Sequence, residues 1–147
     1  MTHGLMCSQP FVYSELVQRL KKSGLRPTRQ RVILANILFG RGARHLTAEQ
    51  LHREVRDNAL RISLATVYNT LNQFVDAGLL REIQGQGQQT YFDTRTEDHF
   101  HFVLPQNGGL VDFPAHGVDF AKLPALPPGT EIDRVEVTIH LKPLGKA

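Results

Sequence analysis

Residues 63–93 constrain the fold more than any other part of the chain. Ser63 is a good helix N-cap, and Gly78 stands where a left-handed C-terminal cap is expected. Residues 79–84 and 88–93 have the pattern of two short strands around a glycine-containing turn at 85–87. Between cap and glycine, apolar side chains recur at helical spacing: Leu64, Val67, Leu71, Phe74 and Val75.

Three further helices are predicted upstream of this one. The first runs from an N-cap at Ser14 to about residue 22, and the second opens at Thr28 and stops at Gly40. The third has the clearest start, because Thr47 and Gln50 form a capping box. Helices joined by a turn and followed by a hairpin predict a winged helix-turn-helix domain over residues 1–93.

The pattern changes after residue 93. Residues 94–98 are polar and predict a hinge. Strands are predicted at 99–104, 110–113 and 135–141, with one short helical turn near 118–122. A sheet of so few residues is too small to bury a core of its own, so we expect it to pair with a second copy. The predicted fold class is α+β, with the winged helix-turn-helix domain followed by a small α/β dimerisation domain (99–147) that contains a three-stranded sheet.

Composition narrows the class of protein. The longest apolar runs are far shorter than the roughly 20 residues that span a membrane. The N-terminus lacks the pattern of a secretory signal, and the single cysteine, Cys7, cannot form an internal disulfide. We therefore expect a cytoplasmic protein with no membrane partner.

Charge is unevenly distributed along the chain. Residues 1–95 hold 13 Lys and Arg against 7 Asp and Glu, a balance of +6, whereas residues 96–147 hold 4 against 7, a balance of −3. A basic first part joined to an acidic remainder indicates two roles, with a polyanion as the partner of the first.

The polar face of the 63–75 helix is the candidate DNA reader. Its residues are short, neutral and hydrogen-bonding, whereas a merely solvated face carries Lys and Glu more often; an ordinary polar surface is the alternative. Near the start of a helix in the major groove, Asn bonds adenine and Tyr contacts a thymine methyl. Arg26, Arg29 and Arg31 are candidates to neutralise phosphates, and Arg26 to enter a minor groove. The face comprises Ala65, Thr66, Tyr68, Asn69 and Asn72.

A pair of histidines is the candidate ligand site. His99 and His101 lie two apart on a predicted strand, so their side chains project from the same face. Two such imidazoles suit a shared metal ion, or one suits a haem iron. Acidic neighbours such as Asp93 strengthen the site, and His45 is a possible ligand from the other domain.

Several segments resemble the ferric uptake regulator family, over roughly residues 15–113: residues 25–31, 45–51, 63–74 with 77–79, and 99–101 followed by Gly108. The resemblance implies homodimers that bind palindromic, A·T-rich operators and respond to metal status. It puts the family's regulatory metal ligands on His45, Asp93, His99 and His101. It puts the base-reading residues on Tyr68 and Asn69, and the minor-groove basic residue on Arg26.

The chain departs from the family pattern at several positions. Leu104 and Asn107 replace a cysteine pair that often holds structural zinc, and the C-terminal cysteine pair is missing, so no four-cysteine zinc site is expected. A second family metal site is predicted to be broken, because Phe100 stands where a carboxylate is usual. Asp93 stands where the family usually has Glu, and Asn69 where a basic residue is common.

Loss of the cysteines together with Tyr68-Asn69-Thr70 resembles the iron response regulator branch of alphaproteobacteria, which senses haem directly or through its synthesis. This resemblance implies that His99 and His101 form a haem-responsive element. Cys7 is followed by Ser8 where some members carry a Cys-Pro haem motif, so we expect no thiolate ligand.

These observations predict a homodimeric transcription regulator of iron and haem homeostasis genes. It would bind double-stranded operator DNA in response to haem or a divalent ion (Fe, Mn or Zn). The alternative within the family is a sensor of manganese, zinc or peroxide. A nucleic-acid-binding module without a sensing role is a further alternative. A metal hydrolase is disfavoured, because the chain has no His-Glu-x-x-His motif and no obvious nucleophile, so we do not expect an enzyme.

Overall fold

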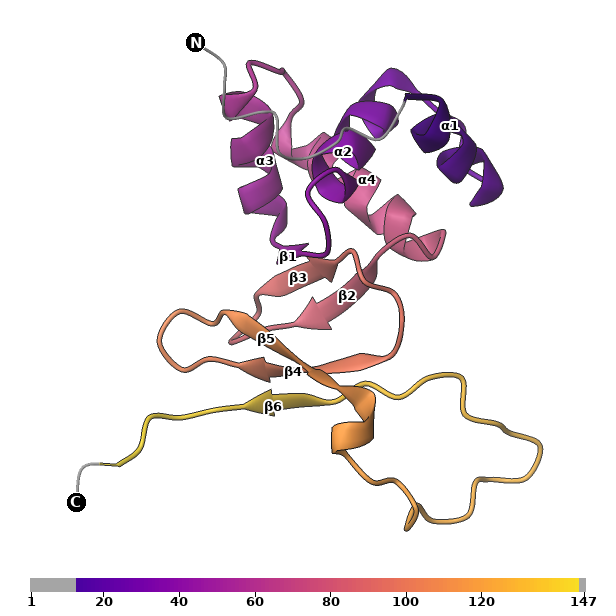
Figure 1. The fold of residues 1–147 in the computed structure, drawn as a ribbon, viewed down its shortest axis with the longest axis vertical. Helices are drawn as coiled ribbons and strands as arrows, with labels where there is room; N and C mark the ends of the chain where they lie inside the picture. The colour runs from indigo at the N-terminus through magenta and orange to yellow at the C-terminus, as the bar shows by residue number, and fades with distance from the viewer. Residues whose placement is uncertain (1–12, 146–147) are drawn as a thin grey trace. The chain divides into compact units, whose positions relative to one another are not determined.

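A computed structural model describes residues 13–145, which divide into two compact units (Figure 1). One unit comprises residues up to Ile83 with Gln89–Thr96, and the other comprises Gln84–Gln88 and the residues from Glu97 onward. Apart from Gln84, the last residue of β2, the first unit contains the following elements: α1 (Tyr13–Lys22), α2 (Arg29–Phe39), β1 (His45–Leu46), α3 (Ala48–Asp57), α4 (Leu64–Asp76), β2 (Arg81–Gln84) and β3 (Thr90–Asp93). The second contains β4 (His99–Val103), β5 (Leu110–Pro114), a 3-10 turn, η2 (Ala115–Gly117), and β6 (Thr138–His140).

Three of the predicted helix starts are confirmed by their caps. The Thr28 hydroxyl accepts a hydrogen bond from the Arg31 amide, and the Ser63 hydroxyl accepts one from the Thr66 amide. Thr47 and Gln50 form both bonds of the capping box at the start of α3. The predicted cap at Ser14 is wrong, because α1 begins at Tyr13 and Ser14 lies within its first turn.

The four helices of the first unit pack around one hydrophobic core. Burial along α4 differs from the predicted apolar face of this helix. Leu64, a member of that predicted face, is 36% exposed, whereas Thr70, which is not a member, is buried beside Leu71. Leu64 is the first residue of the helix. Core residues with essentially no exposure include Leu34, Leu38, Leu51, Val55, Val67, Leu71 and Phe74.

A three-stranded sheet completes the first unit, in the order β1-β3-β2. The predicted hairpin is present, and the structure adds a third strand that the sequence pattern does not indicate. β1 pairs antiparallel with β3, so that His45 lies opposite Asp93 and Leu46 opposite Phe92. A strand of two residues is too short to show alternation, and only its partner in the fold defines it.

The sheet of the second unit has the order β5-β4-β6, with β5 antiparallel and β6 parallel to the central strand. Two expectations are corrected here. The last strand is three residues long rather than 135–141. The helical turn lies at Ala115–Gly117 rather than 118–122, because Val118 is extended and the Asp119 carboxylate accepts the Ala121 amide in a local turn instead.

Few side chains of the second unit are buried. Phe100, Val103 and Leu110 are its buried hydrophobic residues, whereas Val111, Ile139 and Leu141 are 37–44% exposed. The register places Phe102 beside both Val111 and Ile139, so these exposed side chains share one face of the sheet. No helix among residues 13–145 is long and apolar enough to cross a membrane.

Candidate metal centre and DNA-facing helix

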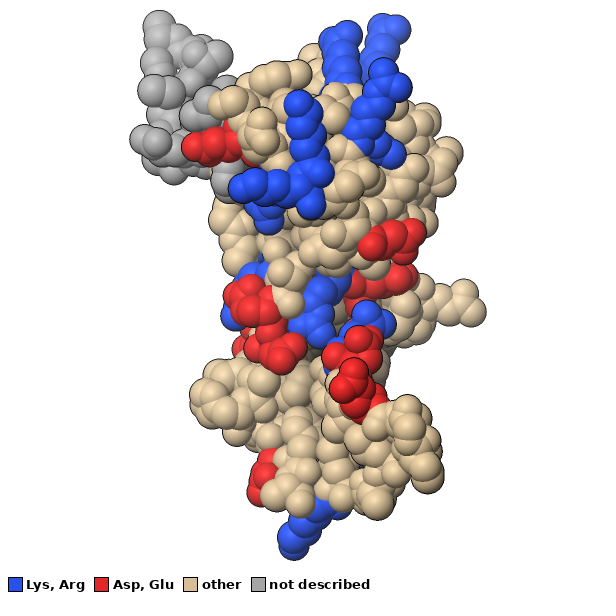
Figure 2. Space-filling view, turned by 90° about the vertical axis from the view of Figure 1, so that its right-hand side faces the viewer, with Lys and Arg blue, Asp and Glu red and all other residues tan. Residues whose placement is uncertain are grey.

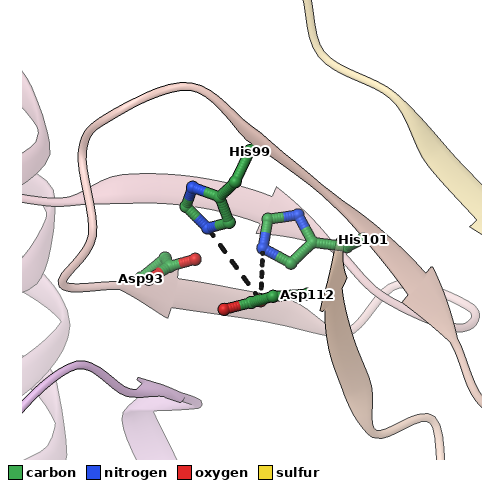
Figure 3. Close-up of side chains that lie close together, drawn as sticks. All are labelled: Asp93, His99, His101 and Asp112. Carbon is green, nitrogen blue, oxygen red and sulfur yellow. Dashed lines mark ion pairs between the residues drawn. The ribbon is translucent and has the colours of Figure 1, made fainter. Parts of the chain in front are cut away.

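The β4–β5 hairpin brings three ligand-type side chains together. His99 and His101 alternate onto one face of β4, and the register sets Asp112 of β5 opposite His101. The Nε2 atoms of His101 and His99 lie 3.2 Å and 3.9 Å from Asp112 Oδ1 (Figure 3). One ligand atom from each of the three residues lies within 4.8 Å of the others.

The orientation of His99 suits a metal ligand. Its Nδ1 lies 2.7 Å from the Glu97 carbonyl oxygen. Because a carbonyl only accepts, Nδ1 must donate, which leaves the Nε2 lone pair directed to the Asp112 side of the ring. A backbone carbonyl that fixes the tautomer in this way is a common support for metal-ligating histidines.

The donor set of the hairpin fits a divalent ion. Two imidazole nitrogens and one carboxylate oxygen suit Fe²⁺, Mn²⁺ or Zn²⁺. Haem fits less well, because both rings are buried: the side chains of His99 and His101 are 2% and 6% exposed. An axial histidine must present its nitrogen to a broad planar cofactor, whereas these two converge on a single carboxylate.

The two other predicted ligands lie in the first unit. His45 and Asp93 are opposite each other across β1 and β3, and Asp93, which Figure 3 also draws, is 1% exposed. One Asp93 carboxylate oxygen accepts a hydrogen bond from the Arg95 amide. The His45 ring contacts the Tyr91 ring edge-on, with 6.3 Å between the two ring centroids. The structure thus pairs His45 with Asp93 in one unit, and His99 with His101 in the other.

Asp112 is the ligand candidate that sequence reasoning missed. The position of the turn could have indicated it. In a hairpin that pairs Val103 with Leu110, residue 101 lies opposite residue 112. The sequence predicts the turn at 105–108 and both strands, but it leaves open which residues of the two strands lie opposite each other. Phe100, at which a second family metal site is predicted to be broken, is buried against the rings of Phe113 and Phe120.

The predicted reader face of α4 is largely exposed. Ala65, Tyr68, Asn69 and Asn72 are exposed, whereas Thr66 is half-buried and its hydroxyl accepts a hydrogen bond from Ser63. Arg26 and Arg29 are exposed as well. On the face drawn in Figure 2, Lys and Arg side chains gather over the helical part of the chain.

Arg31 makes contacts within the protein, and the phosphate contact predicted for it stays a prediction. Its guanidinium donates to the Gln73 side-chain oxygen at 2.9 and 3.3 Å, and to the Arg26 carbonyl at 2.9 Å. It therefore joins the start of α2 to α4 and to the loop that carries Arg26.

Tyr68 is held by a carboxylate of the preceding helix. Its hydroxyl donates to Glu49 Oε1 at 2.5 Å. This bond lowers the pKa of Glu49, helped by a bond from its own backbone amide, by the Thr47 hydroxyl and by the charge of Arg53; desolvation opposes them. The same bond, with desolvation and the Glu49 charge, raises the pKa of Tyr68. At neutral pH the proton therefore stays on Tyr68 and the charge on Glu49.

Several solved structures share this fold. The ferric uptake regulator of Vibrio cholerae, described with DNA-binding domains, superposes with a TM-score of 0.68 at 26% identity, covering 86% of this chain and 98% of that one. The ferric uptake regulator of Pseudomonas aeruginosa with manganese superposes at 0.70 and 22% identity, covering 88% and 98%. The predicted α+β class is confirmed.

Sequence comparison identifies the family. The peroxide operon regulator of Bacillus subtilis (strain 168) is 34% identical over 105 residues, 71% of this chain and 72% of that protein. The peroxide-responsive repressor PerR of Staphylococcus aureus (strain Mu50 / ATCC 700699) is 32% identical over 99 residues, 67% and 66% of the two. A model described as the ferric uptake regulator family matches residues 22–140. The chain belongs to the ferric uptake regulator family, whose members are transcription regulators and not enzymes.

Proposed function

We propose that the protein is a homodimeric DNA-binding repressor whose operator affinity depends on a divalent metal ion and responds to peroxide. The observation that carries this proposal is the convergence of His99, His101 and Asp112 on one point of the β4–β5 hairpin. Peroxide is favoured over haem because the two relatives described above are named for peroxide response. A manganese- or zinc-responsive regulator has the same ligand chemistry and is separated from it by the test below.

The complete ligand set in this proposal has five members. His99, His101 and Asp112 come from the second unit, and His45 and Asp93 from the first. His45 and Asp93 are included because they lie opposite each other across β1 and β3 and because Asp93 is buried. The motifs around them also resemble those of the ferric uptake regulator family. An ion that recruits ligands from both units favours one arrangement of the chain, to the extent that it binds that arrangement more tightly.

Peroxide sensitivity follows from the choice of ion. Bound Fe²⁺ would supply redox chemistry with peroxide, whereas Mn²⁺ and Zn²⁺ in the same ligands would not. His99, His101 and Asp112 would hold the ion, and the burial of both imidazoles would limit the access of bulk water to it. Hydrogen peroxide would be the oxidant and the bound Fe²⁺ the reductant, and loss of Fe²⁺ from these ligands would release the operator.

DNA recognition is assigned to α4 and to basic residues near it. Tyr68, Asn69 and Thr66 would meet base edges in the major groove, and Arg26 and Arg29 would contact the phosphate backbone. The exposure of Tyr68, Asn69, Arg26 and Arg29 supports this assignment, and Thr66 is half-buried. Operator DNA as the partner implies that the protein acts in the cytoplasm.

The test is an operator gel shift with apo protein and with Mn²⁺, Fe²⁺, Zn²⁺ or haem added in turn. We expect the Mn²⁺ and Fe²⁺ forms to bind and the apo form to bind poorly. Hydrogen peroxide should release the Fe²⁺ form and leave the Mn²⁺ form bound. If haem alone controls binding and shifts its Soret band on addition, the peroxide proposal is wrong and the haem hypothesis holds.

A variant that replaces both His99 and His101 by Ala should remain folded and lose the metal response. Replacing His116, an exposed histidine of the same unit, by Ala is the matched control and should leave the response intact. A metal response that survives in the double variant would remove the β4–β5 hairpin from the proposal.

A further inference from the structure

The contact between Glu49 and Tyr68 joins two helices through side chains that are both open to solvent. Glu49 lies in the first turn of α3, and Tyr68, in α4, is 38% exposed. Their hydroxyl-to-carboxylate bond is as short as such charge-assisted bonds are observed to be. The capping box at Thr47 and Gln50 fixes the backbone on either side of Glu49, and the bond to Tyr68 orients its carboxylate.

The direction of this bond determines what Tyr68 can offer to another molecule. A tyrosine hydroxyl has one proton and also accepts through its lone pairs. An ionised carboxylate accepts only, so the single proton must point to Glu49. Toward any other partner the Tyr68 oxygen is then an acceptor, in addition to the apolar edge of its ring.

We propose that Glu49 is a specificity-determining positioning residue, which makes the Tyr68 hydroxyl an obligate acceptor toward the base edges of bound DNA. This inference rests on the proposed function of α4 as the reading helix. In the major groove, adenine N6 and cytosine N4 are donors, whereas guanine presents O6 and N7 and thymine presents O4 as acceptors. The arrangement favours adenine or cytosine at the base that meets the Tyr68 oxygen, and it disfavours guanine and thymine there.

Glu49 also places a negative charge beside the proposed DNA-facing surface. A carboxylate there opposes the attraction of phosphates for the basic part of the chain. It therefore weakens binding to every sequence while it sharpens the choice between bases, which is how a repulsive element contributes to specificity.

The experiment selects duplexes from a random-sequence library with the Mn²⁺-loaded full-length protein. Base preference is then measured at each position for the wild type, Glu49→Ala, Glu49→Gln and Tyr68→Phe. One position should favour adenine or cytosine in the wild type. In Glu49→Ala that preference should fall about fivefold, which corresponds to the free energy of one hydrogen bond. Guanine or thymine should then be selected more often at this position. Affinity for unrelated duplex should rise.

Two variants separate the proposed role from a general loss of charge or fold. Glu49→Gln keeps an oxygen that can accept the Tyr68 proton, but its amide NH2 can also donate to the Tyr68 oxygen. This variant should therefore keep part of the preference, more than Glu49→Ala does, while it gains the affinity for unrelated duplex. Glu15→Ala removes an exposed carboxylate from α1 and is the matched charge control, with no expected change in preference. Tyr68→Phe should lose the preference at the same position, and adding Glu49→Ala to it should change the preference no further.

The outcomes distinguish this inference from the function on which it rests. If Tyr68→Phe alters one position and Glu49→Ala selects the same bases as the wild type, the role of Glu49 is overturned and the DNA-binding function stands. If the wild type selects no sequence at all, the proposed function fails, and the role of Glu49 fails with it.

Discussion

At the residue scale, the chemistry depends on which atom of each side chain holds its proton. The Glu97 carbonyl holds the proton of His99 on Nδ1, so that Nε2 can ligate a metal. Glu49 likewise orients the proton of Tyr68. In both places a neighbouring acceptor converts an ambiguous side chain into one with a defined donor or acceptor role.

Asp112 provides the residue-scale prediction. Replacing Asp112 by Ala removes a proposed ligand, the carboxylate on which both imidazoles converge. We expect the affinity for Mn²⁺ to fall by at least about tenfold, the loss that already follows when a residue that only orients a ligand is removed. Isothermal titration calorimetry on the apo protein measures this. Asp133→Ala, which removes an exposed carboxylate of the same unit, is the control; equal affinities in both variants would contradict the role of Asp112.

At the element scale, the helices begin where local hydrogen bonds satisfy their first amides, and the hairpins bring distant residues together. The β4–β5 register, rather than any sequence motif, carries Asp112 to the histidines. The pairing of β1 with β3 sets His45 opposite Asp93 in the same way. Each half of the proposed ligand set is therefore assembled by one pair of antiparallel strands.

The capping box of α3 gives the element-scale prediction. Thr47 is buried, and its hydroxyl accepts the Gln50 amide while the Gln50 side chain accepts the Thr47 amide. Thr47→Ala should lower the free energy of unfolding by about 1 kcal/mol, the usual value of an N-cap. Urea denaturation measures the change. Thr47→Ser retains the hydroxyl and should lose less; an equally large loss would assign the effect to the methyl group instead.

At the scale of the whole molecule, the two units differ in how far they bury their own side chains. The core cluster lies in the first unit, whereas the second buries few hydrophobic residues and exposes Val111, Ile139 and Leu141 on one sheet face. An exposed apolar face on so small a sheet is expected to meet a second copy.

Oligomeric state gives the whole-molecule prediction. The wild type should be a dimer by light scattering both before and after chelation of metals, because the proposed contact is apolar. Ile139→Asp should shift the mass toward that of a monomer while the helices keep their circular dichroism signal. Glu131→Lys, at an exposed loop position, should remain dimeric. A protein that dimerises only with stoichiometric zinc would contradict the metal-independent dimer.

Local signals alone determined most of the first unit. The caps at Thr28, Thr47 and Ser63, the spacing of Val67, Leu71 and Phe74, and the hairpin after Gly78 are predictable from sequence, because each depends on neighbours within about one or two turns. The pairing of His99 with His101 on one face is of the same kind, since it follows from strand alternation.

Only the tertiary structure decided the contacts between distant segments. β1 exists because it pairs with β3, Asp112 reaches the histidines through strand register, and Tyr68 meets a carboxylate 19 residues earlier in the chain. Arg31 bonds Gln73, 42 residues away. The physical reason is that such contacts depend on how elements pack and align, and neither side-chain spacing nor intrinsic propensity along the chain contains that information.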